Sequence, residues 1–297
     1  MNQRTPLFAS LALVAALGGG DDDDSKTIVD VAADSGDFTI LVGALEATGL
    51  DATLSGDGPF TVFAPTDAAF ERLPAGVLDS LDADTLSQIL TYHVAAGEVG
   101  SDVVVTLDSA TTVEGSNLNI QASSAGVFLN GVTQVIQTDV AADNGVIHAI
   151  DSVLLPPSIA FPGDIVQAAQ AYPALDTLVG AVVSAELVDD LQSTNNGDGF
   201  TVFAPDNQAF ADLDIDLSSL SASDLGNVLL YHTIGERVDS SAVVGLSEAT
   251  TLQGASIDIA VSEGTVRLNG DASVVQVDLR TSNGIIHIID SVLLPPQ

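Results

Sequence analysis

Hydrophobic residues along the chain change from a helical to a strand-like spacing, and they do so twice. In the first stretch, residues 40–48 and 86–90 carry apolar side chains three or four positions apart, which is the period of an amphipathic helix. Residues 118–121 then alternate apolar and polar side chains, as a half-buried strand does. The pattern therefore predicts helices in the front half of this stretch and strands in its back half.

Two Asn-Gly pairs, Asn130-Gly131 and Asn144-Gly145, separate short apolar runs in the back half. Asn-Gly is a strong hairpin signal because both residues tolerate positive φ. The pairs predict a meander of three strands near residues 127–129, 132–137 and 146–155. Residues 61–64 predict a further strand, stopped by Pro65, and either Thr66 or Asp67 is expected to cap a helix that runs through Phe70.

The same sequence motifs return later in the chain. PFTVFAPTDAAF at residues 59–70 is followed by GFTVFAPDNQAF at 199–210, Tyr92-His93 by Tyr231-His232, and NGVIHAIDSVLLPP at 144–157 by a copy at 283–296 that is identical at 12 of 14 positions. Solenoid repeats have periods of roughly 20 to 50 residues, so a period of 139 residues indicates a duplicated domain.

We therefore predict an α+β protein with two tandem domains. The expected boundaries are a signal peptide and acidic flexible segment over 1–26, a first domain over 27–157, a linker over 158–161 and a second domain over 162–297. The linker region is short, rich in proline and carries the apolar Ile159 and Phe161. These features favour fixed contact between the copies over a loose tether.

The N-terminus has the pattern of an export signal. A positive charge at Arg4 precedes the apolar run LFASLALVAAL at 7–17, which is too short to span a bilayer, and the acidic GGGDDDD follows. The run at 14–18 resembles a bacterial lipobox, but Leu17 stands in the place of the lipid-accepting Cys. Cleavage after Ala16 and a Cys altered to Leu17 are the alternatives. We expect export to the periplasm, cell surface or extracellular medium, with no stable membrane span after processing.

The charge of the chain narrows the choice of partners. Six Lys and Arg against 41 Asp and Glu give a formal net charge of −35, and there is no Cys. A polyanion repels phosphate backbones and anionic lipid, so nucleic acid is excluded as a partner. The absence of Cys excludes disulfides, thiolate metal sites and Cys nucleophiles.

The residues carry no recognisable catalytic or metal-binding pattern. There is no G-x-S-x-G elbow, no HExxH and no Walker loop, so we expect no enzyme, no cofactor and no metal site. His148 and His287 lie in apolar strand sequence, and we predict core imidazoles whose ring nitrogens are hydrogen-bonded. The apolar motifs TVFAP and VLLP are predicted to be core strands.

Taken together, TVFAP with its following Ala-Phe, the Tyr-His pair and the closing IHxIDSVLLP segment resemble the fasciclin (FAS1) domain, in two copies of about 130 residues. The resemblance implies a wedge of β-strands with packed helices, used outside the cell for adhesion. In animal members the Tyr-His region is linked to integrin binding. By position, the resemblance gives four candidate partner-binding residues: Tyr92, His93, Tyr231 and His232.

Two functional hypotheses follow. The first is a non-catalytic extracellular adhesion or matrix-binding module, whose partner is an extracellular matrix polymer, a polysaccharide or a surface protein. The alternative is a Ca²⁺-dependent assembly protein that uses its acidic surface, in which cations join copies of the chain. Weak self-association is left open by both hypotheses. For Tyr92 and Tyr231 themselves, we predict burial in the core with the hydroxyl hydrogen-bonded inside the domain, in preference to a role as exposed anchors.

Overall fold

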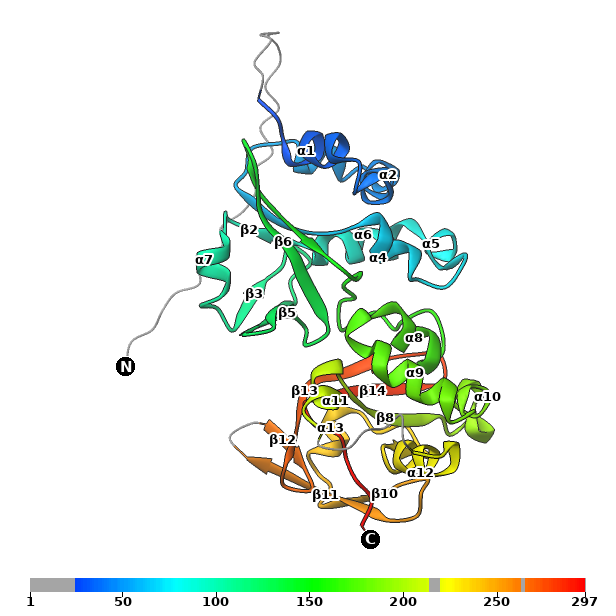
Figure 1. The fold of residues 1–297 in the computed structure, drawn as a ribbon. Helices are drawn as coiled ribbons and strands as arrows, with labels where there is room; N and C mark the ends of the chain where they lie inside the picture. The colour runs from blue at the N-terminus through cyan, green and yellow to red at the C-terminus, as the bar shows by residue number, and fades with distance from the viewer. Residues whose placement is uncertain (1–24, 214–219, 263–264, 297) are drawn as a thin grey trace.

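The computed structural model describes residues 25–213, 220–262 and 265–296, and these residues form two domains of the same topology (Figure 1). The fold class predicted from the sequence, α+β with a wedge of strands and packed helices in each copy, is confirmed. Most of the predicted signal peptide and acidic segment lies outside the described residues. Within the residues that are described, no helix is long and apolar enough to cross a bilayer.

The first domain runs from helices at its start to strands at its end, with further helices between its first strands. Its elements are α1 Ile28–Ser35, α2 Thr39–Thr48, α3 Asp51–Leu54, β1 Phe60–Pro65, α4 Asp67–Glu71, α5 Val77–Ser80, α6 Ala83–Tyr92, β2 Val94–Ala96, α7 Ser101–Val104, β3 Ser109–Thr111, β4 Asn117–Ser123, β5 Gly126–Leu129, β6 Thr133–Ala142 and β7 Gly145–Ile150.

The second domain repeats this order with two short 3₁₀ turns added, and the positions that correspond to α5 lie outside the described residues. Its elements are α8 Ile165–Ala171, η1 Pro173–Leu175, α9 Asp176–Ser184, α10 Val188–Gln192, η2 Asn195–Gly197, β8 Phe200–Pro205, α11 Asn207–Ala211, α12 Ala222–Tyr231, β9 Thr233–Ile234, α13 Ser240–Val243, β10 Glu248–Thr250, β11 Ser256–Ser262, β12 Thr265–Leu268, β13 Ala272–Arg280 and β14 Gly284–Ile289.

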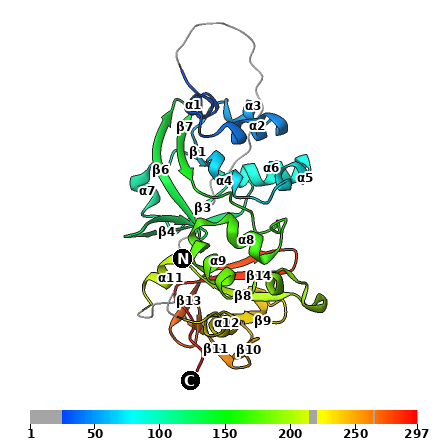
Figure 2. The same ribbon diagram turned by 45° about the vertical axis from the view of Figure 1, so that its right-hand side comes forward.

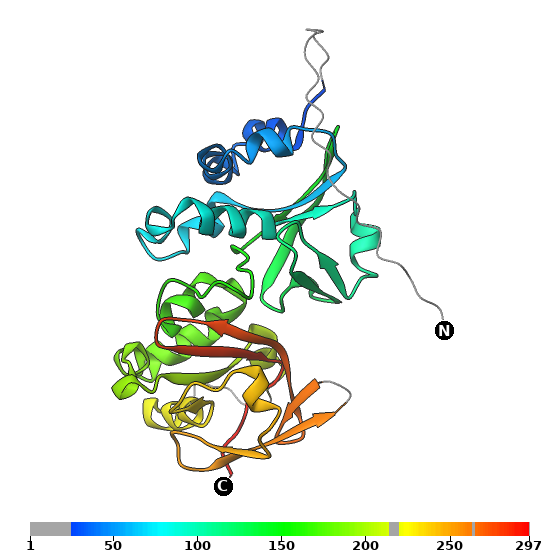
Figure 3. The same ribbon diagram turned by 180° about the vertical axis from the view of Figure 1, so that it is seen from behind.

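Each domain is built on one seven-stranded sheet, in the order β2-β1-β7-β6-β5-β4-β3 for the first. Only β1 and β7 pair in parallel, and β8 and β14 do the same in the second domain, while the other pairs in both sheets are antiparallel. Parallel strands are covered on both faces, which explains why the TVFAP and GVIHAI runs are apolar apart from Thr61 and His148. In the first domain the larger helices α1, α2 and α6 lie on one side, and strands β3 to β5 lie on the other with the short helix α7, as Figure 1 and the view from behind in Figure 3 both show.

Most predicted elements of the first domain are present. The helical periods lie in α2 and α6, the alternating run lies in β4, and Thr66 is the N-cap of α4 because its side chain accepts the Ala69 N–H. The predicted third strand of the meander is wrong at its end, however. Strand β7 stops at Ile150, and the VLLP segment after it is coil.

The VLLP segment is buried without being a strand. Leu154 is 1% exposed, but its N–H donates to Nε2 of His93 instead of to a neighbouring strand. The apolar sequence therefore predicts the burial of this segment correctly. Its prediction of a strand is wrong, because the Leu154 N–H donates to a side chain and not to the backbone of a neighbouring strand. The chain also turns at Asp143 and Asn144, one residue earlier than the Asn-Gly pair predicts, and Gly145 is already the first residue of β7.

The two domains touch through the turn after β5 and through the linker. Val132, from the first domain, is 3% exposed and belongs to the hydrophobic core of the second. Phe161 is 2% exposed in the same core, and Ile159 packs on the first-domain core. Figure 2 shows α8 and α9 between the first domain and strands β8 and β14. Polar contacts add to this packing: the Arg72 guanidinium pairs with the carboxylate of Asp176.

Candidate functional site at the Tyr-His motif

The Tyr-His motif lies at the C-terminal end of one helix in each domain. Tyr92 is the last residue of α6 and His93 its C-cap, and Tyr231 and His232 hold the same positions on α12. The four side chains are between 1% and 2% exposed. The structure therefore places these predicted site residues inside their domains, and their role in partner binding stays a prediction.

His93 joins the end of α6 to the VLLP segment. Its Nδ1 lies 2.7 Å from the Ile89 carbonyl oxygen, and its Nε2 accepts the Leu154 N–H at 2.9 Å. Nε2 therefore carries no proton, and Nδ1 is the protonated nitrogen that donates to Ile89. Burial disfavours the charged ring and lowers the pKa of His93 to about 4.

His232 makes the same connections in the second domain. Its Nδ1 lies 2.8 Å from the Val228 carbonyl oxygen, and its Nε2 accepts the Leu293 N–H at 2.9 Å. Burial lowers the pKa of His232 to about 4 as well. The duplicated geometry shows that the histidine of the motif locks the closing VLLP segment onto a helix end.

The motif tyrosine connects the end of its helix to the strands of the same domain. In the first domain these contacts are with β4 and with the turn after β5. The Tyr92 hydroxyl donates to the Asn117 carbonyl oxygen at 3.1 Å and accepts from Nδ2 of Asn130 at 3.0 Å. Asn130 then accepts the Asn119 N–H through its side-chain oxygen. Burial raises the pKa of Tyr92. In the second domain, Tyr231, Ser256, Asn269 and Asp258 form the same chain of hydrogen bonds.

The strand histidines are buried and hydrogen-bonded in both domains. His148 and His287 are each 1% exposed, and each Nδ1 accepts a backbone N–H, from Asp139 and Asp278 respectively. The Nε2 atoms donate to the carbonyl oxygens of residues 99 and 238. Burial lowers the pKa of His287. Both rings are therefore satisfied core imidazoles. Across the described residues, no group of three or more His, Asp or Glu side chains is arranged to hold a metal ion.

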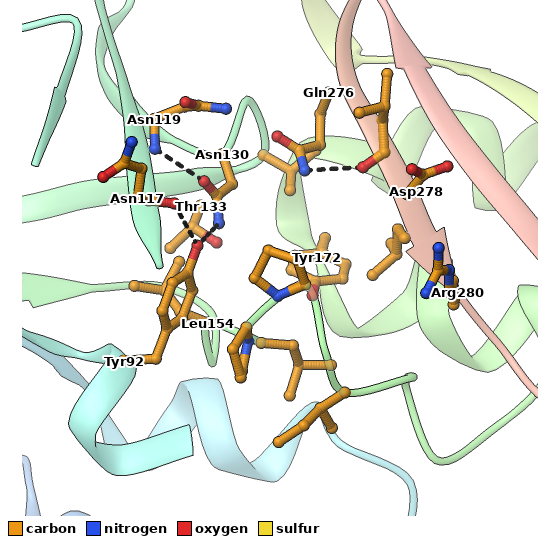
Figure 4. A pocket seen from close by; sticks show the side chains of 17 residues that line it. Tyr92, Asn117, Asn119, Asn130, Thr133, Leu154, Tyr172, Gln276, Asp278 and Arg280 are labelled. Atoms are coloured by element: carbon orange, nitrogen blue, oxygen red, sulfur yellow. Dashed lines mark hydrogen bonds between the residues drawn. The ribbon is translucent and has the colours of Figure 1, made fainter. Parts of the chain in front are cut away.

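Tyr92 also borders a cavity between the two domains. The cavity has a volume of about 180 Å³ and takes its walls from β4 to β6, the VLLP segment, the linker, the start of the second domain and β13. Figure 4 shows Tyr92, Asn130 and Thr133 on one side, with Gln276, Asp278 and Arg280 across from them. Asn119, Val277 and Arg280 are exposed, so the cavity opens to solvent along that edge.

The sequence patterns did not point to several residues of this site. Thr133, Tyr172 and Gln276 line the cavity, yet none lies in a repeated motif. They come from segments far apart in the chain and meet only because the domains dock. Asn130 carried a signal, since it belongs to an Asn-Gly pair, but we interpreted that pair as a turn and not as the partner of a tyrosine hydroxyl.

The family of the chain follows from comparison with known proteins. A model of the fasciclin domain matches residues 36–156 and again residues 173–295, which together are most of the chain. The chain belongs to the fasciclin domain family. The duplicated Tyr-His geometry described above lies within both matched segments.

Relatives of this fasciclin protein occur in bacteria and animals. Protein sll1483 of Synechocystis is 46% identical over 137 residues, which are 45% of this chain and 75% of that protein. The pig (Sus scrofa) transforming growth factor-beta-induced protein ig-h3 is 30% identical over 250 residues, which are 82% of this chain but only 35% of ig-h3. This chain therefore spans about a third of the length of that animal protein.

Among solved structures, the chain resembles a FAS1 domain pair from the insect cell adhesion molecule fasciclin I. The TM-score is 0.50 at 22% sequence identity, and the match covers 88% of this chain and 98% of the insect pair. The shared fold therefore extends over both domains.

Proposed function

We propose that this protein is a non-catalytic extracellular adhesion or matrix-binding module, which binds a matrix polymer, polysaccharide or surface protein through exposed parts of its two domains. Fasciclin domains are typically adhesion modules of extracellular proteins. The observation that carries the proposal concerns the two copies of the Tyr-His motif. Each Tyr-His pair is buried and hydrogen-bonded within its own domain. A partner of the folded protein meets the exterior instead.

The exterior offers apolar side chains at equivalent positions of the two domains. Val105 and Val113 of the first domain are 48% and 51% exposed, and their counterparts Val244 and Leu252 are 52% and 42% exposed. Because each of these side chains is exposed in both copies, we take these positions as the candidate contact residues for a partner. Their repetition in both domains supports a surface that each copy presents in the same way.

Binding to a glycan array and to immobilised matrix proteins tests this proposal. Val113→Ser and Leu252→Ser should reduce binding without lowering the melting temperature, because substitutions of exposed residues change stability by only about 0.5 kcal/mol. Ile136→Ser is the matched control, since Ile136 is 52% exposed but lies on β6 and does not belong to the exposed apolar positions that recur in both domains. Unchanged binding in both Val113→Ser and Leu252→Ser would contradict the proposal that these exposed positions contact the partner.

The motif tyrosine separates a direct contact from a packing role. Tyr92→Ala should lower stability and adhesion together, because it removes a fully packed ring. Full stability with abolished adhesion would move the binding site to the Tyr-His motif. Repeating the measurements with millimolar Ca²⁺ tests the alternative of cation-bridged assembly: a Ca²⁺-dependent rise in both melting temperature and oligomer size would favour it over the proposed adhesion module.

A further inference from the structure

The cavity between the domains contains buried polar atoms that the protein itself does not satisfy. Thr133 is 0% exposed and its Oγ1 has no hydrogen-bond partner, and the same is true of the buried Oε1 of Gln276. Both residues line the cavity, one from each domain. Buried polar atoms nearly always have partners, because leaving one unpaired destabilises the fold. A molecule in the cavity that reached these two atoms would supply the hydrogen bonds that they lack.

A third polar group faces the same space. Tyr172 is 4% exposed, lines the cavity, and forms no side-chain hydrogen bond to any described residue. Burial is the main cause of a raised pKa at Tyr172, and the nearby Tyr92 raises this pKa further. Tyr172 therefore presents a neutral hydroxyl that can donate or accept.

Comparison of the two copies shows that the fold does not require these groups. The repeat offset places Ala272 at the position of Thr133 and Ser35 at the position of Tyr172. Ala272 is 1% exposed, so the same buried position is filled without a hydroxyl in the second domain. Gln137, the counterpart of Gln276, is exposed. A buried polar group is thus present at each of these three positions only where the domains meet.

The charges around the cavity disfavour an ionic ligand. Asp278 and Arg280 are the charged residues in the lining and their charges cancel. The carboxylate of Asp278 is also occupied, because it accepts hydrogen bonds from the backbone N–H and hydroxyl of Ser240. The remaining walls combine amide and hydroxyl groups with the apolar Leu155, Pro157 and Ile159.

We propose that this cavity binds a small uncharged polyhydroxylated molecule of the size of a monosaccharide. A sugar hydroxyl can donate to Oε1 of Gln276 and can either donate to or accept from Oγ1 of Thr133. The C–H faces of a sugar ring fit the apolar walls. The volume of about 180 Å³ far exceeds the roughly 10 to 15 Å³ that one water needs, and it is below the roughly 300 to 1,000 Å³ of sites for drug-sized ligands.

This site is separate from the proposed adhesive surface. It takes a free small molecule into the interior of the domain pair, whereas adhesion is assigned to exposed side chains such as Val113 and Leu252. Binding is measured on the purified chain with no adhesion partner present. Loss of one activity therefore leaves the other measurable.

The tyrosines of the chain supply a direct readout. The protein has no Trp and three Tyr, and two of them, Tyr92 and Tyr172, line the cavity. In a Tyr231→Phe background, tyrosine emission therefore reports on the cavity alone. Titration with glucose, galactose, mannose, N-acetylglucosamine and myo-inositol, each up to about 100 mM, should give a saturable change with at least one of them. That range covers dissociation constants near 1 mM, which correspond to about −4.1 kcal/mol.

A matched pair of threonine variants makes the result specific. Thr133→Val keeps the shape of the side chain and removes the unpaired hydroxyl, so it should fold normally and weaken sugar binding about tenfold or more. Thr201→Val is the control: this threonine is also 0% exposed, but its hydroxyl donates to the Glu236 carbonyl oxygen, away from the cavity. It should lower the melting temperature and leave the dissociation constant unchanged.

Two outcomes would overturn the proposal. One is the absence of a saturable response to all five compounds, which would mean that water alone fills the cavity. The other is an equal response in the Thr133→Val variant, which would show that the sugars act through general exclusion from the protein surface. A saturable response that only Thr133→Val weakens supports the site.

Discussion

Each motif histidine is held in a single tautomer by the two groups that it joins. Nδ1 of His93 donates to a helix carbonyl, and Nε2 accepts the Leu154 N–H. A second proton on the ring would remove the acceptor that Leu154 uses and would place a charge in a fully buried position. The same holds for His232 and Leu293. At the scale of single residues, acid therefore acts on the folded core through these two rings.

The pH dependence of stability follows from this geometry. The pKa of His93 and of His232 falls from 6.5 to about 4 on folding, so below pH 6.5 the unfolded state binds protons that the folded state does not. The histidine contribution is therefore complete above pH 6.5 and is lost as the pH falls toward 4. Each ring accounts for about 3 kcal/mol over that window. Urea unfolding between pH 7.5 and 5 measures the slope.

A neutral substitution provides the control for the pH dependence. His93→Gln keeps a donor and an acceptor and cannot be charged, so the free energy of unfolding should depend less steeply on pH, by up to about 1.4 kcal/mol per pH unit. The quantity to compare is the slope of the unfolding free energy against pH, and not the absolute stability of the variant. A slope identical to that of the wild-type chain would contradict the assignment of the pH dependence to His93.

At the scale of elements, the parallel strands β1 and β7 form the centre of the first domain. Phe63 on β1 is 1% exposed and stacks on His148 of β7 with ring centroids 5.6 Å apart, and Phe203 stacks on His287 in the second domain. Phe63→Ala and Phe203→Ala should each destabilise their own domain by about 3 to 5 kcal/mol, as truncation of a buried Phe generally does. Calorimetry of the two single variants measures this loss.

Solvated loops provide the matched comparison for these core positions. Asp57 lies in the exposed turn before β1, and Asp57→Ala should change stability by no more than about 0.5 kcal/mol. Asn196 lies in the exposed turn before β8 but has a φ of 56°, a left-handed conformation that Ala adopts less readily, so Asn196→Ala should cost more, about 1 kcal/mol. If the Phe variants were as mild as these loop variants, the strands would not be the core of each domain. If adhesion fails in a Phe variant, the loss of the fold is sufficient to explain it.

The elements that sequence patterns predicted correctly are those whose burial and backbone pairing agree. Strand β1, a short and nearly continuous apolar run, and helix α6, which has a helical apolar period, are present as predicted. The pattern failed at the VLLP segment because the apolar sequence registers burial, whereas a side chain, His93, takes the hydrogen bond that would define a strand. The cavity could not be predicted because Thr133, Tyr172 and Gln276 come together only through domain docking.

At the scale of the whole molecule, the net charge of −35 acts against the compact state. The Debye length contracts from about 30 Å at 0.01 M salt to about 8 Å at 0.15 M, so screening removes most of the repulsion over that range. The melting temperature should rise steeply between 0.01 and 0.15 M NaCl and change little above it. A melting temperature independent of salt would show that the acidic surface is not repulsive.

The docking of the domains is encoded in residues that differ between the copies. Val132 is buried in the core of the second domain, while its counterpart Asp271 is charged and exposed. On the receiving side, the buried Tyr172 corresponds to the exposed Ser35. The contact residues Val132 and Tyr172 are therefore present only at the junction of these two domains. Their counterparts Asp271 and Ser35 disfavour the stacking of further copies in the same head-to-tail way.

We expect the two fasciclin domains to form one fixed unit, with the cavity and Tyr92 at their junction. Because the chain has no Cys, spin labels at Val113→Cys and Val261→Cys, which are 51% and 48% exposed, report a single interdomain distance. Double electron–electron resonance should give one narrow distance distribution, and Val132→Asp should broaden it by breaking the junction. A broad distribution in the chain without Val132→Asp, as expected for domains on a flexible tether, would contradict the account.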